Sequence, residues 1–129
     1  MEACLTLPRR LKQKKNRSGR WRSARHCDFV RDHACCVPGC NGGPIEVAHL
    51  RVGTDAATGR KASDWFTISL CFAHHRGGED NQHSLGEPSF EKKFGIDLHA
   101  LAAEFAEKSP KAADIRLAQR ARALEFTCG

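Results

Sequence analysis

Cysteine and histidine are the residues of this chain whose spacing points most directly to chemistry. The 129 residues include seven Cys and seven His. Two pairs stand about 30 residues apart: Cys35 and Cys40 with four residues between them, and Cys71 and His74 with two. A Pro-Gly turn just before Cys40 would direct both sulfurs of the first pair at one point, and zinc takes thiolate and imidazole ligands in a tetrahedron. The spacing therefore predicts a structural Cys3His zinc site.

The first pair has an alternative partner, because Cys36 precedes Cys40 with three residues between them. We prefer Cys35, since its four-residue gap is the more usual one in zinc fingers. Three further cysteines lie alone and are expected to be ordinary buried or exposed thiols: Cys4, Cys27 and Cys128. The N-terminus has no apolar signal segment, so we expect a cytoplasmic location, where thiols stay reduced and clustered cysteines are metal ligands before they are disulfides.

Three histidines are left for a second site. If His74 faces the zinc, His75 points roughly 100° away around the helix, and His83 follows in the next loop. His49 ends the first of two expected strands. On a hairpin followed by a helix these three side chains converge on one face, which predicts a second metal site beside the zinc.

The positive charge of the chain is concentrated in one segment. The net charge is +6, but residues 9–25 contain nine basic residues and no acidic one, while the rest of the chain has 12 basic and 15 acidic residues. The basic residues of this segment are Arg9, Arg10, Lys12, Lys14, Lys15, Arg17, Arg20, Arg22 and Arg25. Such an arm suits a phosphate backbone, because each paired phosphate releases a counterion, and Trp21 could stack on a base. We therefore expect DNA as the partner.

The remaining pattern predicts one small α+β domain behind a flexible arm. The arm spans 1–25 and the domain spans 26–129, a length that supports one modest core. No apolar run approaches the roughly 20 residues of a membrane span, so no membrane association is expected. Strands are predicted over 45–50 and 66–70 from their β-branched and aromatic residues, with loops over 51–64 and 78–86. Helices are expected over 71–76, over 89–94 before Gly95, after Asp97, and after Ser109-Pro110.

Together these residues resemble the HNH endonuclease superfamily, whose ββα-metal fold is a hairpin plus a helix. The resemblance covers about residues 33–108. It comprises the Cys pair, Ala-His-Leu-Arg at 48–51, Gly-Arg-Lys-Ala-Ser-Asp-Trp at 59–65, Leu-Cys-Phe-Ala-His-His at 70–75 and His-Ser-Leu-Gly-Glu at 83–87. The form is similar to a phage and prophage branch that includes recombination-associated nucleases. A recombination or phage protein is the further partner that this branch implies.

The resemblance implies hydrolysis of DNA phosphodiesters, as a nick or a double-strand cut, with one divalent ion, Mg²⁺ or Mn²⁺. It makes His49 the general base and gives His75 and His83 to the ion. Asp64 is the nearest candidate for the residue that orients the base, with Asp55 a weaker one.

Ala48 departs from the pattern of the superfamily. Many members carry an Asp or His ligand at this position, so the ion would borrow a carboxylate such as Asp64 or Glu46. Arg51 and Arg76 flank the expected site and could hold phosphates.

The departure at Ala48 leaves two other functions open. One is a non-catalytic zinc-stabilised DNA-binding module, and the other is a zinc-stabilised protein-interaction domain. The three histidines favour the nuclease, because neither alternative needs them.

Overall fold

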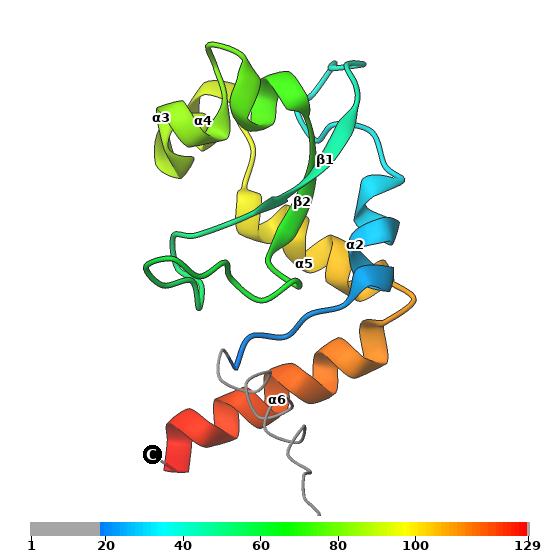
Figure 1. Ribbon diagram of the computed structural model, residues 1–129, viewed down its shortest axis with the longest axis vertical. Coiled ribbons are helices and arrows are strands. Elements are labelled where there is room, and N and C mark those ends of the chain that lie inside the picture. Colours follow the sequence, from blue (N-terminus) through cyan, green and yellow to red (C-terminus); the bar gives the residue numbers. More distant parts are fainter. Residues whose placement is uncertain (1–18, 129) are drawn as a thin grey trace, which may run out of the picture.

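The computed structural model describes residues 19–128, with side chains to Leu124. Six residues of the expected arm lie outside the described residues: Arg9, Arg10, Lys12, Lys14, Lys15 and Arg17. The described elements follow the order α2 (Ala24–Arg31), β1 (Ile45–His49), β2 (Thr67–Cys71), η2 (Ala73–Gly77), α3 (Gln82–Leu85), α4 (Glu87–Phe94), α5 (Leu98–Lys108) and α6 (Ala112–Cys128). The fold is a small α+β arrangement in which helices surround one central hairpin (Figure 1).

The hairpin is antiparallel and confirms both expected strands. Ile45 pairs with Cys71 and His49 pairs with Thr67, so β2 begins and ends one residue later than predicted. This register brings Cys71, at the end of β2, beside Ile45 at the start of β1. The opposite end of the hairpin carries His49, so His49 and Cys71 lie toward opposite ends of one two-stranded sheet.

The core holds the hairpin against the helices that follow it. Ala48, Ile68 and Leu70 of the strands pack with Phe90 of α4, and all four are fully buried. Leu98 and Ala102 of α5 belong to the same cluster. Removing a buried Leu or Phe side chain from such a core typically costs about 2–5 kcal/mol of stability.

The helix ends follow the local signals in the sequence. Asp97 caps α5 by accepting the Ala100 N–H at 3.0 Å, and Gly95 ends α4 with φ 66°, in the left-handed region that favours glycine. The helix expected over 71–76 is a short π-helix, η2. Helix α3 corrects the loop expected over 78–86. Its four residues are capped by Asn81, whose side chain accepts the Ser84 N–H at 2.7 Å.

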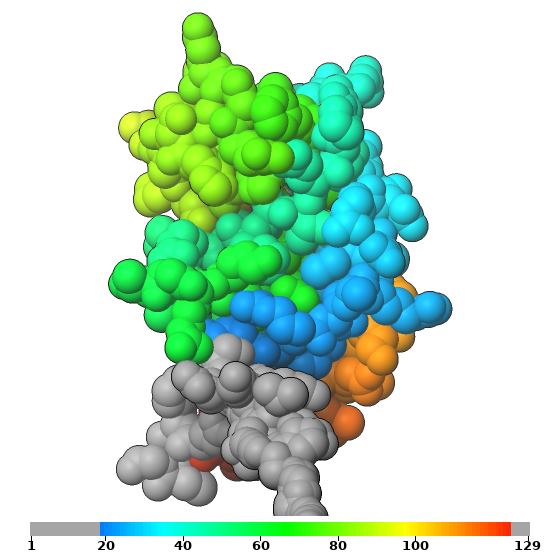
Figure 2. All heavy atoms as spheres, viewed as in Figure 1, coloured from blue at the N-terminus to red at the C-terminus, as the bar shows by residue number. Residues whose placement is uncertain are grey.

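The boundary between arm and domain also differs from the prediction. Residues 19–25 are part of the folded body, and the Trp21 ring lies against Trp65 with centroids 5.7 Å apart. The Asp64 N–H donates to the Trp21 carbonyl at 2.9 Å. In Figure 2 this blue segment lies beside green parts of the chain. Trp21 is therefore occupied by packing in the protein itself.

Among the described helices, none is long and apolar enough to cross a membrane.

Candidate metal centre and histidine groove

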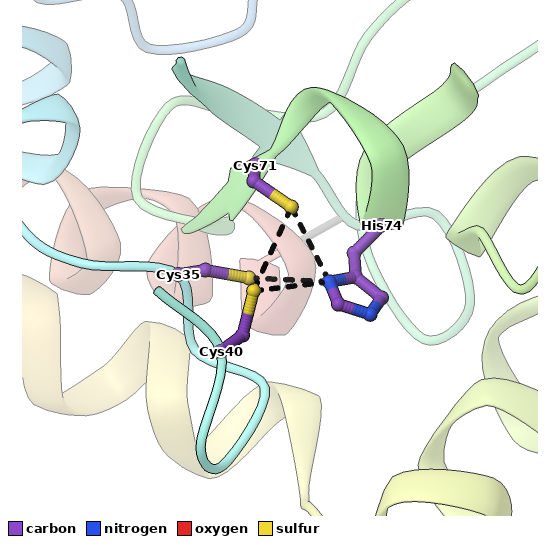
Figure 3. A group of neighbouring side chains, drawn as sticks. All are labelled: Cys35, Cys40, Cys71 and His74. Carbon is purple, nitrogen blue, oxygen red and sulfur yellow. Dashed lines mark hydrogen bonds between the residues drawn. The ribbon is translucent and has the colours of Figure 1, made fainter. Parts of the chain in front are cut away.

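The four predicted zinc ligands meet at one point (Figure 3). Their ligand atoms, three Sγ and the Nδ1 of His74, all lie within 4.8 Å of one another. The sulfurs of Cys35, Cys40 and Cys71 lie 3.6, 3.5 and 3.3 Å from His74 Nδ1. The Cys40 and Cys71 sulfurs are 3.9 Å apart. This group could hold a metal ion.

The distances agree with a tetrahedral zinc site. With Zn–S near 2.3 Å and Zn–N near 2.0–2.1 Å, a tetrahedron separates two sulfurs by about 3.8 Å and a sulfur from a nitrogen by about 3.6 Å. The Gly42 N–H also donates to Cys40 Sγ at 3.3 Å, which favours a thiolate at that position. A Cβ at Gly42 would meet the sulfurs of Cys40 and Cys71 at 3.4 Å, so the turn after Cys40 closes tightly over the centre.

Cys36 lies outside this cluster. Its Sγ is 3.5 Å from Ser69 Oγ, and Cys36 is not among the four converging residues. The structure thus selects Cys35, the partner preferred from the sequence. The ring of Phe94 packs edge-on against His74, with centroids 5.2 Å apart, and connects the centre to α4.

A groove of about 900 Å³ lies beside β1 and is lined by the three remaining predicted histidines, together with Asp64 and Glu46. Four basic residues also line it: Arg22, Arg31, Arg51 and Lys61. The groove thus combines imidazoles and carboxylates with a set of cations. This combination suits an anionic substrate, because cations lining a cleft of low dielectric concentrate their field in it.

His49 and Asp64 form a hydrogen-bonded pair in the groove. His49 Nε2 lies 2.8 Å from Asp64 Oδ1, and the two side chains are 15% and 8% exposed. An ionised carboxylate only accepts hydrogen bonds, so the proton sits on Nε2 and the lone pair of the ring sits on Nδ1. Of the two candidate carboxylates, Asp64 is thus the one that contacts His49, whereas Asp55 accepts hydrogen bonds from Ser63.

The N-terminal segment keeps Asp64 ionised. The Ser23 N–H donates to Asp64 Oδ2 at 2.8 Å, and Arg22 lies 3.2 Å from Oδ1. Burial opposes ionisation of Asp64, yet the hydrogen bonds from His49 and the Ser23 N–H hold the pKa of this carboxyl below its usual value. The Asp64 carboxylate therefore stays charged across the neutral range.

His75 and His83 lie together on the groove wall, with ring centroids 5.0 Å apart. His75 Nδ1 lies 2.7 Å from Glu46 Oε1. Burial lowers the pKa of His75, against the opposing effect of Glu46, so its imidazole is neutral, as a metal ligand must be. Of the two carboxylates considered for the place of Ala48, Glu46 lies with this pair and Asp64 lies with His49. Ala48 itself is fully buried in the core.

The predicted phosphate-binding residues have different surroundings. Arg51 lines the groove. Arg76 is bound to Glu46 through two hydrogen bonds of 3.0 and 2.9 Å, and the bonds from Arg76 and His75 lower the pKa of Glu46 to about 2. Arg20 donates to the Asp55 carbonyl at 2.8 Å. Sequence reasoning missed Arg31 and Lys61, because only the fold brings the end of α2 and the 51–64 loop to the same groove.

The chain belongs to the family described as Protein of unknown function (DUF968), whose model matches residues 9–111. The matched span contains every residue of the Cys-His centre and of the groove described above. No curated protein and no solved structure matches the chain significantly.

Proposed function

We propose that this protein is a metal-dependent DNA endonuclease of the HNH type, stabilised by a zinc ion and acting in the cytoplasm. The single observation that supports this most is the His49–Asp64 pair, with Nε2 and Oδ1 2.8 Å apart, in a groove that His75 and His83 also line. A binding module needs no imidazole held in one tautomer by a carboxylate. General base catalysis requires an imidazole held in this way.

The chemistry proceeds from the lone pair of His49 Nδ1. This nitrogen takes a proton from a water molecule as the water oxygen forms a bond to phosphorus, and the bond from phosphorus to the leaving oxygen breaks. Asp64 stabilises the imidazolium that results, because its charge stays beside Nε2–H. His75 and His83, with Glu46 as the nearest carboxylate, would hold Mg²⁺ or Mn²⁺. Such an ion, when bound, stabilises the charge that develops on the phosphate and the leaving oxygen.

The substrate backbone is held by the cations that line the groove. Arg51 and Lys61 offer charge to phosphates, and Arg22 does so while it also contacts Asp64. The basic residues of 9–17 would add contacts that do not depend on sequence. DNA is the partner we propose, because cations in the groove and in the 9–17 segment would pair with the phosphates of its backbone.

Zinc in the Cys35–Cys40–Cys71–His74 centre has a structural role in this account. All four protein ligands are present, which fills the tetrahedron and excludes substrate, as in closed structural sites. The centre joins the segment before β1, the end of β2 and η2, and η2 carries His75. The zinc therefore fixes the element that presents one of the two candidate ion ligands.

The experiment is cleavage of supercoiled plasmid by purified zinc-loaded protein. Samples without added ion are compared with samples that contain MgCl₂ or MnCl₂. Chelators are left out because they would also remove the zinc. We expect nicked or linear DNA only where Mg²⁺ or Mn²⁺ is added. A protein that shifts the plasmid in a gel but cleaves it with neither ion would instead be the non-catalytic DNA-binding module.

A further inference from the structure

A buried carboxylate in the groove wall has no part in the mechanism above. Glu87 is 9% exposed, and its Oε2 accepts the Arg51 N–H at 2.7 Å while its Oε1 accepts the Val52 N–H at 3.0 Å. Burial of a charge is costly unless hydrogen bonds compensate for it, and bonds to an ionised acceptor are the strong ones. Glu87 therefore fixes the two residues that begin the loop after β1.

Gln82 extends this contact to His49. Its Nε2 donates to Glu87 Oε2 at 3.2 Å and to the main-chain carbonyl of His49 at 3.2 Å. Both partners are acceptors, so the nitrogen of the amide must face them. Gln82 is 4% exposed, which leaves this side chain little freedom to turn. A continuous path of hydrogen bonds thus runs from Glu87 through Gln82 to the backbone of His49.

The chain order makes this path a link between two parts of the site. Gln82 is the immediate neighbour of His83 in α3, and Glu87 opens α4 directly after Gly86. Gly86 has φ 84°, a conformation that permits the sharp turn between the two short helices. The segment formed by α3 and α4 therefore contains His83. The same segment is hydrogen-bonded to the backbone of His49 at the end of β1.

We propose that Glu87 and Gln82 are positioning residues that set the separation of His49 and His83, and hence of the base from the catalytic ion. This inference rests on the proposed nuclease function. In this role neither Glu87 nor Gln82 contacts the reacting atoms. Productive geometry must be held within about 0.5 Å, and loss of such supporting hydrogen bonds typically costs 10–100-fold in activity.

The test uses Glu87→Gln, with Glu91→Gln as its matched control. Glu91 lies one turn later on α4 and also accepts a backbone N–H, from Leu98 at 2.8 Å, but it does not line the groove. In zinc-loaded protein with Mn²⁺ and saturating DNA, we expect Glu87→Gln to cleave about 10–100-fold more slowly than wild type. Its dissociation constant for DNA should stay within about twofold of wild type. Glu91→Gln should cleave at the wild-type rate.

A second variant and a spectroscopic readout separate positioning from folding. Gln82→Met removes the bond to the His49 carbonyl and leaves both backbone contacts of Glu87 in place. If Glu87→Gln does not fold, the cleavage rate of Gln82→Met tests the positioning role by itself. The imidazole NMR signals of His49 and His83 should shift in Glu87→Gln and Gln82→Met and stay unchanged in Glu91→Gln. Variants Glu87→Gln and Gln82→Met that cleave at the wild-type rate would overturn the proposal and leave the nuclease function standing. If wild type itself does not cleave, the nuclease function fails, and unshifted NMR signals would separately refute the geometric link.

Discussion

The metal centre yields the sharpest prediction about stability, through Cys71→Ser. Cys35 and Cys71 are 7% and 3% exposed and belong to the core cluster that contains Ile68 and Leu70. Structural zinc contributes an apparent binding free energy of about 10–16 kcal/mol in zinc-finger peptides, whereas the whole stability of a domain is about 5–15 kcal/mol. If zinc occupies the centre as proposed, its loss should therefore remove most or all of the folding free energy. Even a loss of about 3 kcal/mol would lower Tm by roughly 10–25 °C.

The assay combines metal analysis with thermal unfolding followed by circular dichroism. We expect about one zinc per wild-type chain, and little zinc with no cooperative unfolding transition in Cys71→Ser. The matched control is Cys36→Ser. It removes the thiol next to Cys35, and this thiol contacts Ser69 and is not one of the four converging ligands. This control should keep its zinc and a Tm within a few degrees of wild type. A Cys71→Ser protein that is free of zinc and unfolds at the wild-type Tm would refute the reasoning, as would loss of zinc from Cys36→Ser.

Three further predictions concern the His49–Asp64 pair, the basic segment before residue 19, and the buried His26. Asp64→Asn should slow cleavage by about 10²–10⁴-fold, because the amide no longer selects the tautomer of the base, while Asp80→Asn, which changes an exposed carboxylate, should cleave normally in the same single-turnover assay. Removal of residues 1–18 should reduce the slope of log affinity for DNA against log salt by up to about 5, since six cations are lost, and an unchanged slope would exclude the arm from DNA contact. Burial lowers the pKa of His26, so below about pH 6.5 the unfolded chain binds more protons than the folded one and stability falls as pH falls. His26→Gln should therefore show a smaller loss of Tm between pH 7.5 and 5.5 than wild type, and an equal loss would contradict this.

The parts of the site that follow from local sequence were predictable. A Pro-Gly turn before Cys40 and a two-residue gap before His74 bring ligands together over short stretches of chain, and the structure brings those side chains to one point. The strands followed from β-branched residues, and the start of α5 from the Asp97 cap. These signals depend on neighbours in sequence, so they survive without knowledge of the fold.

The contacts that depend on distant segments were not predictable. Ser23 and Arg22 reach Asp64 from 41 and 42 residues away, because Trp21 packs against Trp65. The run of basic residues over 9–25 led to the prediction of one continuous arm. Its last members, Arg20, Arg22 and Arg25, lie among residues 19–25, which belong to the folded body. The bonds between Glu87 and the loop after His49 also span about 35 residues. Helix α3 was missed because glycines on both sides of it, Gly77, Gly78 and Gly86, favour a loop, and the Asn81 cap outweighs them.

The proposed function depends most directly on His49 as the base. The decisive measurement is the single-turnover rate constant for cleavage of a labelled DNA duplex in Mn²⁺ by zinc-loaded wild type, His49→Ala and the control His33→Ala, which changes an exposed histidine outside the groove. We expect His49→Ala to be slower by about 10²–10⁴-fold, with unchanged zinc content, and His33→Ala to equal wild type. Equal rate constants for His49→Ala and wild type would contradict the account.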